Sequence, residues 1–166
     1  MKRIGRGMLC LTLVAIVLGS TASGQDLSLS LTDPANGSQV RVEPGARALH
    51  LVFLAVWCSR CIDELDPLTE LEARWNGHGY RLVLIAVQTR HTSERLARFA
   101  ADHRLPGEFL FDVTGNAAAS LDAGELPTHL VFDETGREVL RSASYQNGVA
   151  DAVGHLLAEP SAGSSP

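Results

Sequence analysis

Two nearly continuous apolar segments place the strongest limit on how this 166-residue chain can fold. The segments are "LHLVFLAV" (49–56) and "YRLVLIAV" (80–87). Such segments are typical of strands that are buried on both faces of a parallel sheet. Between them, "CIDELDPLTELEARW" (61–75) repeats apolar residues at three- and four-residue intervals, which predicts an amphipathic helix. Residues 49–87 are therefore predicted to form a βαβ unit.

The predicted helix has an acidic start and an internal proline. Asp63, Glu64 and Asp66 lie near its N-terminal end, where the helix dipole favours negative charge. Pro67 should interrupt the helix, because proline lacks the N–H that an interior helical residue donates. We expect a kinked helix.

The other predicted elements alternate between strand and helix. Residues 25–48 contain Asp-Pro, Asn-Gly and Pro-Gly turn signals, which predict a hairpin or an extended arm. A helix capped by Ser93 should run to His103. The predicted elements after it are a strand (108–113), a short helix (116–123), an antiparallel hairpin (128–142) and a final helix (147–159). The expected fold class is α/β, with a mixed central sheet flanked by helices.

The first 24 residues have the composition of a secretory signal peptide. Three basic residues precede an apolar run (8–18) and a small-residue segment (19–24). We expect cleavage after Ser23 or Gly24, with an uncleaved inner-membrane anchor as the alternative. The protein is then periplasmic or secreted. The expected domains are this signal (1–24), one α/β domain (25–158) and a disordered tail (159–166).

Charge excludes one class of partner. Removing residues 1–24 leaves 11 cationic against 19 acidic residues, a formal charge of −8. An acidic domain without a basic stripe argues against nucleic acid as a partner.

Two cysteines remain after the signal, in "VWCSRC" (56–61). Cys58 lies where the first apolar strand ends and the helix begins, so unpaired backbone N–H groups should lower the pKa of its thiol. Cys61 lies one turn further along and should be shielded. One accessible nucleophile with a resolving thiol within reach is the arrangement that thiol–disulfide exchange needs. A purely structural disulfide would stabilise little, because its loop is short.

A metal site is the alternative use of this pair. Structural zinc needs four ligands, and no two histidines have the spacing that would complete the usual set. Folding could still bring His129 near the cysteines, since its strand is expected beside the first one. A copper-binding metallochaperone that uses Cys58, Cys61 and His129 therefore stays open.

The order of these features resembles the thioredoxin fold, and in particular its exported TlpA/ResA-like branch. Trp57-Cys58-Ser59-Arg60-Cys61 follows an apolar strand, and Leu126-Pro127-Thr128 opens the later hairpin. The resemblance covers residues 30–158. It implies a cis peptide bond before Pro127, which would hold a substrate chain opposite the disulfide together with Leu126 and Thr128. Trp57 is then expected at the rim or in the core beside Cys58.

The resemblance also implies an activity. It indicates a thiol–disulfide oxidoreductase that reduces disulfides of exported proteins, including apocytochrome c. A membrane thiol–disulfide electron donor is then expected to reduce the oxidoreductase again. No dissociable cofactor is implied, because the redox group is the Cys58–Cys61 disulfide. A thiol peroxidase shares the fold, but its nucleophile lies in an upstream Thr/Pro-rich turn that this sequence lacks.

Three positions depart from the family pattern. Arg60 replaces the proline that many relatives carry before the second cysteine, and Pro67 lies one residue later than usual. Val52 occupies the position of the buried carboxylate of thioredoxin proper, which puts a carboxylate-assisted deprotonation of Cys61 in doubt. The Arg60 charge should favour a Cys58 thiolate by about 1 kcal/mol after screening, which is too little to decide the direction of electron flow.

Overall fold

The central sheet has seven strands in the order β2-β1-β5-β4-β3-β6-β7. The computed structural model describes residues 27–87 and 90–158, so the expected signal segment and tail lie outside the described residues. The strands are β1 (Leu29–Thr32), β2 (Gln39–Val42), β3 (Ala48–Leu54), β4 (Tyr80–Ala86), β5 (Glu108–Phe111), β6 (Thr128–Asp133) and β7 (Glu138–Ser142). The helices are α1 (Ser59–Asp63), α2 (Leu65–Trp75), α3 (Ser93–His103), α4 (Asn116–Ser120) and α5 (Val149–Ala158).

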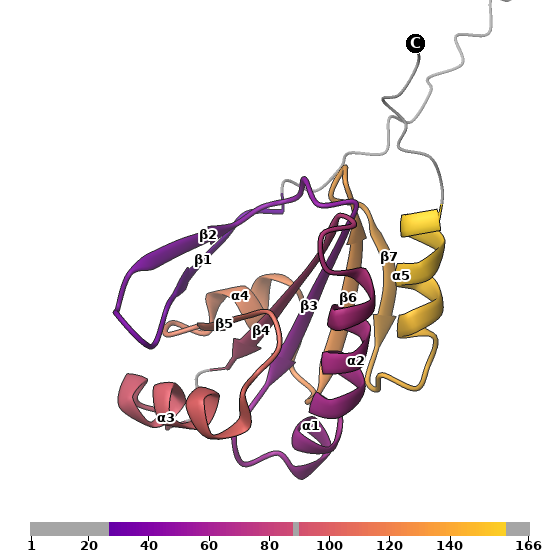
Figure 1. Cartoon of the computed structure of the whole chain (residues 1–166). Coiled ribbons are helices and arrows are strands. Elements are labelled where there is room, and N and C mark those ends of the chain that lie inside the picture. The colour runs from indigo at the N-terminus through magenta and orange to yellow at the C-terminus, as the bar shows by residue number, and fades with distance from the viewer. Residues whose placement is uncertain (1–26, 88–89, 159–166) are drawn as a thin grey trace, which may run out of the picture.

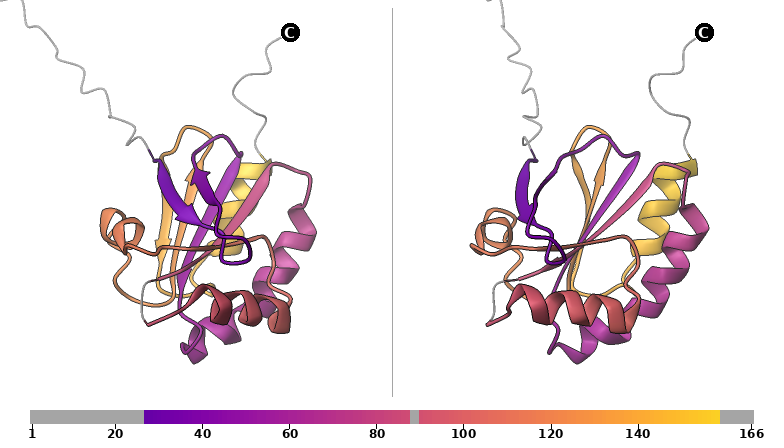
Figure 2. Two further views of the ribbon diagram at one scale, coloured as in Figure 1. Left: turned by 90° about the vertical axis from the view of Figure 1, so that its left-hand side faces the viewer. Right: turned by 60° about the vertical axis from the view of Figure 1, so that its left-hand side comes forward.

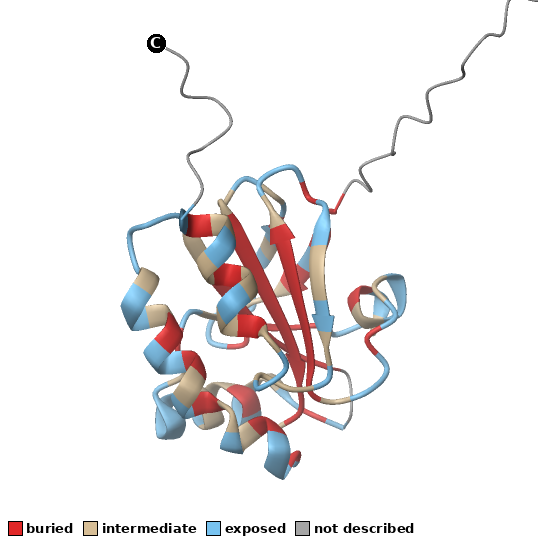
Figure 3. Cartoon of the chain, turned by 90° about the vertical axis from the view of Figure 1, so that its right-hand side faces the viewer, coloured by how far each residue is buried: buried red, intermediate tan, exposed pale blue. Residues whose placement is uncertain are grey.

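The predicted βαβ unit forms the middle of the sheet (Figure 1). β3 pairs with β4 in parallel, from Ala48 opposite Tyr80 to Leu54 opposite Ala86. All seven residues of β3 are buried, as Figure 3 shows for the central strands. This confirms the prediction from the apolar runs, because a central strand covered on both faces has no polar side to show.

The predicted kink is a full break in the helix at Glu64. Glu64 ends α1 and precedes α2, while Pro67 is the third residue of α2. Proline at position 67 has no N–H for the carbonyl of Asp63 four residues earlier, so the helix is interrupted there and resumes with Pro67 in its first turn. Glu64 is thus the residue between the two helices, with φ −92° and ψ −2°.

The N-terminal arm is a hairpin that extends the sheet. β1 pairs with β2 in antiparallel register, from Leu29 opposite Val42 to Thr32 opposite Gln39. Thr32 also pairs with Phe111 of β5, which attaches the hairpin to the sheet edge. One predicted cap is wrong. Thr92, and not Ser93, caps α3, because its hydroxyl accepts the N–H of Arg95 at 3.3 Å.

Helices cover the sheet as expected for the predicted fold class. α2 and α5 lie side by side on one face and α4 lies on the other side (Figure 2). Leu71 of α2 packs with Val153 of α5 and with Val131 of β6. β6 and β7 form the predicted antiparallel hairpin, and β6 also pairs with β3. Among residues 27–87 and 90–158, no helix is both long and apolar enough to cross a bilayer.

Candidate active site

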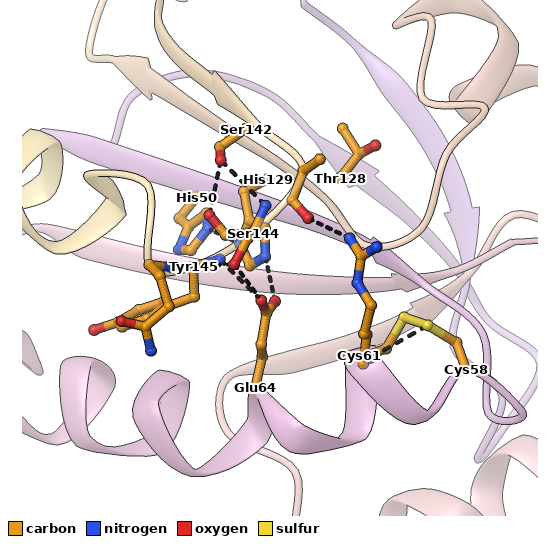
Figure 4. Close-up of polar contacts among 12 residues, drawn as sticks. His50, Cys58, Cys61, Glu64, Thr128, His129, Ser142, Ser144 and Tyr145 are labelled. Carbon is orange, nitrogen blue, oxygen red and sulfur yellow. Dashed lines mark hydrogen bonds and ion pairs between the residues drawn. A yellow bond between two sulfur atoms is a disulfide. The ribbon is translucent and has the colours of Figure 1, made fainter.

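Cys58 and Cys61 lie at the predicted junction of strand and helix. Cys58 is the N-cap of α1, with φ −84° and ψ 103°, and its Sγ accepts the N–H of Cys61 at 3.2 Å. The two sulfurs form a disulfide, with the Cα atoms 5.2 Å apart. The loop after β3 thus presents one sulfur at the helix start and places the other one turn behind it (Figure 4).

The two cysteines differ in their access to solvent. Cys58 is 8% exposed and Cys61 is 3% exposed. The difference has the predicted direction, although Cys58 is more covered than its predicted role suggests. Cys58 lines an open, mainly apolar cavity of about 430 Å³, together with Trp57, Val87 and Leu126. A partner would therefore reach Cys58 through this cavity.

Trp57 stands at the edge of the cavity. It is 60% exposed, the most exposed large apolar side chain in the described part of the chain. Core packing, one of its two expected roles, is therefore wrong. A wide apolar surface beside Cys58 is available for contact with another molecule.

The segment before β6 forms the opposite side of the cavity. The Leu126–Pro127 peptide bond is cis, as the family resemblance implies. Leu126 lines the cavity, and Pro127 is buried. Thr128 pairs with Phe53 of β3 and donates its hydroxyl to the carbonyl of Glu125 at 2.7 Å. These contacts fix the segment beside the end of β3.

Arg60 is exposed, and its guanidinium is held against another part of the chain. It donates to the carbonyl of Ala143 at 2.9 Å. Ala143 follows β7, so Arg60 connects α1 to the far edge of the sheet. The predicted effect of its charge on Cys58 stays a prediction.

A buried polar chain lies behind the disulfide, and sequence reasoning missed it. His50 and His129 are both fully buried on neighbouring strands, and His50 Nε2 lies 3.1 Å from His129 Nδ1. The Tyr80 hydroxyl lies 2.8 Å from His50 Nδ1, and His129 Nε2 lies 2.7 Å from Glu64 Oε2. Figure 4 shows the two rings between the strands and Glu64.

The other carboxylate oxygen of Glu64 also accepts hydrogen bonds. Glu64 Oε1 accepts the Ser144 hydroxyl at 2.9 Å and the Tyr145 backbone N–H at 3.0 Å. Burial acts to raise the pKa of Glu64, but the hydrogen bonds from His129, Tyr145 and Ser144 outweigh it and hold that pKa below its ordinary value. Glu64 is therefore an ionised, inward-facing carboxylate.

The histidine at the centre of the sheet is neutral. Burial, and then the neighbouring His129, lower the pKa of His50 well below its ordinary value. Burial also raises the pKa of Tyr80, with the charges of Tyr145 and Glu72 adding to this effect. The sequence contained a signal for this buried hydrogen-bond network, because a histidine within a continuous apolar strand must find a buried partner.

The copper alternative depends on a free nitrogen of His129. Both ring nitrogens of His129 are engaged, one with His50 and one with Glu64. Across residues 27–87 and 90–158, no three His, Cys, Asp or Glu side chains are grouped so that they could hold a metal ion. The structure therefore gives no support to His129 as a third ligand beside Cys58 and Cys61.

Solved structures share this fold. A thiol:disulfide interchange protein of the thioredoxin family from Chlorobium tepidum is 17% identical, with a TM-score of 0.65 over 78% of this chain and 93% of that chain. A secreted disulfide oxidoreductase from Mycobacterium tuberculosis, homologous to E. coli DsbE, is 18% identical, with a TM-score of 0.63 over 76% and 95%. StoA from Bacillus subtilis is 14% identical, with a TM-score of 0.65 over 78% and 98%.

The family assignment comes from the sequence. No curated protein matches the chain. Residues 26–139, more than half of its length, match the model of the AhpC/TSA family. The chain therefore belongs to the AhpC/TSA family, and its fold with a Cys-x-x-Cys pair is that of a thioredoxin-like oxidoreductase.

Proposed function

We propose that the protein is an exported thiol–disulfide oxidoreductase that reduces disulfides of other exported proteins. The observation that carries the proposal is the position of Cys58, which lines an open apolar cavity while its disulfide partner Cys61 lies behind it. A structural disulfide has no need of such a cavity. Periplasmic or secreted export agrees with the composition of residues 1–24.

The reaction follows from this asymmetry. In the reduced protein, the Cys58 thiolate attacks one sulfur of the client disulfide, and the client S–S bond breaks as the new Cys58–client bond forms. The released client thiolate takes up a proton. Cys61 then loses its proton and attacks Cys58 Sγ, which releases the second client thiolate and leaves the Cys58–Cys61 disulfide. Two electrons pass to the client.

The surface around Cys58 suits a polypeptide client. The apolar cavity is lined by Gly124 and Leu126, and a second cavity of about 370 Å³ shares Gly124 and is lined also by Glu125, Thr128 and Arg141. We assign client contacts to Trp57, Leu126, Pro127 and Thr128. An extended chain that crosses residues 124–126 would place its own disulfide at Cys58. Apocytochrome c is one such client, and the recharging electrons come from a membrane thiol–disulfide donor.

The test uses the mature chain, in which Cys58 and Cys61 are the only cysteines. Wild-type protein should reduce insulin disulfides with dithiothreitol as the donor, and Cys58→Ala should be inactive. Cys61→Ala should accumulate mixed disulfides with exported proteins, whereas Cys58→Ala should trap none. Preferential alkylation of Cys61 in the reduced protein would reverse the assigned roles. Stoichiometric Cu(I) binding without any disulfide exchange would overturn the proposal.

A further inference from the structure

The cavity beside Cys58 is lined by two further kinds of residue. Three of them have bulky apolar side chains: Trp57, Val87 and Leu126. The other four are small: Gly115, Ala118, Ala123 and Gly124. The space of about 430 Å³ stays open because these four residues have at most a methyl group as a side chain. Its size is within the range of ligand pockets, which is about 300–1,000 Å³.

The lining also limits the chemistry of an occupant. Among the residues that the structure describes, no charged side chain lines this cavity. A charged group that entered it would lose its water without gaining an ion-pair partner, which disfavours binding. An apolar side chain would be favoured, because full burial of a leucine or phenylalanine side chain strengthens binding about tenfold to a hundredfold. The cavity therefore suits a large uncharged side chain.

Hydrogen bonds hold the walls of the cavity in place. The buried Asp112 donates its backbone N–H to the carbonyl of Ala86, the residue before Val87, at 3.0 Å. Its Oδ2 accepts the N–H of Ala118 at 2.9 Å. The carbonyl of Ala118 in turn accepts the N–H of Ala123 at 2.8 Å. The end of β4, α4 and the segment after α4 are thus connected, so the cavity is formed before a client binds and little ordering is needed.

The position of Cys58 identifies the occupant. In the mixed disulfide, the client's cysteine is bonded to Sγ of Cys58, which lines this cavity. Consecutive Cα atoms are about 3.8 Å apart, so the client residues directly before and after that cysteine come nearest to the cavity. The group that fills it is then a side chain of the client that neighbours the client's own cysteine.

We propose that the Cys58 cavity is a specificity pocket that takes one large uncharged side chain, aliphatic or aromatic, next to the reacting cysteine of the client, and that Ala118 and Gly124 set its size. The inference rests on the proposed reduction of protein disulfides. It names the substrate class: disulfides flanked by residues such as leucine or phenylalanine, in preference to disulfides flanked by alanine or by charged residues.

Two lining positions can be enlarged to fill the pocket. A Cβ at Gly124 would meet no heavy atom within 4 Å, and its φ lies outside the left-handed region, so a leucine there extends into open space. Ala118 is half-buried on α4. Ala119, the next residue of α4, is exposed and does not line the cavity. Gly154 of α5 also has open space around a Cβ and lies away from the cavity. Ala119 and Gly154 are therefore matched controls for Ala118 and Gly124.

The first measurement uses the reduced wild-type protein and a series of peptide disulfides. Each substrate is a disulfide-linked pair of one short peptide that has the same residue X on both sides of its cysteine, with X as leucine, phenylalanine, alanine, aspartate or lysine. Each second-order rate constant is divided by that of dithiothreitol with the same peptide, which removes the intrinsic reactivity of the disulfide. The normalised rate constant should be at least about tenfold higher for leucine and phenylalanine than for alanine.

The charged peptides separate a pocket from long-range attraction. An acidic protein attracts lysine and repels aspartate at a distance, whereas an apolar pocket disfavours both. Aspartate and lysine peptides should therefore both react more slowly than the leucine peptide. Equal normalised rate constants for leucine and alanine, or a lysine peptide that reacts fastest, would overturn the proposal.

The second measurement repeats the series with the enlarged residues. Ala118→Leu and Gly124→Leu should each reduce the preference for leucine over alanine peptides to about threefold or less, because the added side chain occupies the pocket. Ala119→Leu and Gly154→Leu should keep the full preference. Circular dichroism confirms that each variant is folded. The proposal fails if a folded Ala118→Leu or Gly124→Leu variant keeps the wild-type preference, or if Ala119→Leu removes it.

A second copy of the chain is the competing occupant, since Trp57 is an exposed apolar side chain that could enter the cavity of another molecule. Sedimentation should show a wild-type monomer, and a dimer that Ala118→Leu dissociates would overturn the proposal. The proposed function is tested separately. Wild-type protein that reduces neither insulin nor any peptide would reject that function, whereas protein that reduces insulin and all peptides at equal normalised rates would reject only the specificity pocket.

Discussion

Val52 and His129 lie directly opposite each other across the antiparallel β3–β6 pair. In thioredoxin proper, the position of Val52 carries a buried carboxylate. In this protein the polar side chain at that place is the imidazole of His129, and its Nε2 lies 2.7 Å from a carboxylate of the helix break, Glu64. The buried polar groups of this protein therefore come from three strands and the helix break.

Replacing Glu64 should remove a pH-dependent part of the stability. The folded pKa of Glu64 lies below its unfolded value, so the group stabilises the fold fully above about pH 4.5 and progressively less as the pH falls through the folded pKa. Glu64→Gln should lower the free energy of unfolding at pH 7 by about 1–3 kcal/mol and flatten its decline in acid. Urea unfolding from pH 7 to pH 3 measures both effects, and Asp63→Asn should leave the curve close to wild type.

Removing the hydroxyl of Tyr80 should cost more than removing that of Tyr145. Tyr80→Phe leaves His50 Nδ1 buried without its donor, which costs about 1–3 kcal/mol. The Tyr145 hydroxyl makes no hydrogen bond within the described residues, so Tyr145→Phe should change stability by less than about 0.5 kcal/mol. If the two variants lost equal amounts of unfolding free energy in thermal or urea unfolding, the hydrogen bond between Tyr80 and His50 would contribute nothing to stability.

Gly107→Ala should destabilise the fold beyond the cost of its backbone angle. Gly107 has φ +65°, and a Cβ there would lie 2.5 Å from the carbonyl oxygen of Leu82. Gly37 has a similar φ of +76° and open space around it, so Gly37→Ala measures the cost of the backbone angle alone. We expect about 1 kcal/mol for Gly37→Ala and at least about 2 kcal/mol more for Gly107→Ala. Equal unfolding midpoints would contradict this expectation.

Truncating Trp57 should affect client turnover and leave stability nearly unchanged. Its side chain is 60% exposed, so Trp57→Ala should change the free energy of unfolding by about 0.5 kcal/mol or less. The loss of apolar surface beside Cys58 should raise KM for a protein disulfide several-fold. Val113, which is 44% exposed and does not line the Cys58 cavity, provides the control. A Val113→Ala effect on KM as large as that of Trp57→Ala would contradict the client role of Trp57.

Replacing Arg60 should make the dithiol slightly more reducing. A cation near Cys58 favours its thiolate and so favours the reduced pair, and about 1 kcal/mol corresponds to roughly 20 mV for two electrons. Arg60→Gln should therefore lower the reduction potential by about 20 mV or less, since Arg60 is exposed and also donates to Ala143. Equilibration with glutathione buffers measures the shift. Arg41→Gln, which changes an exposed side chain of β2, should leave the reduction potential unchanged.

Much of the fold could be read from the sequence because its signals are local. The runs at 49–56 and 80–87 are buried strands because such segments have no polar face, and the three- and four-residue spacing after Cys61 is amphipathic in any context. The placement of Cys58 at a helix start followed directly. Its cavity could not be predicted, because the lining comes from Trp57, Val87 and Leu126, which lie far apart in the sequence.

The helix break shows the limit of a local signal. Pro67 predicts an interruption, but the carboxylate at the interruption is Glu64, and its hydrogen-bond donors come from β6 and from the segment after β7. Acidic residues at a helix start are ordinarily solvated, and Asp63 and Asp66 are exposed as that rule expects. Only the hydrogen bonds from His129, Ser144 and Tyr145 distinguish Glu64 from them.

Hydrophobic periodicity and residue spacing act over a few residues, so most strands and helices, and the two sulfurs at the junction of β3 and α1, could be predicted without coordinates. The buried polar side chains behind those sulfurs depend on long-range strand pairing. His50 and His129 are 79 residues apart in the chain, and they become a buried pair only because β3 and β6 are neighbours. A buried polar group needs a partner, and long-range strand pairing selects which one it finds.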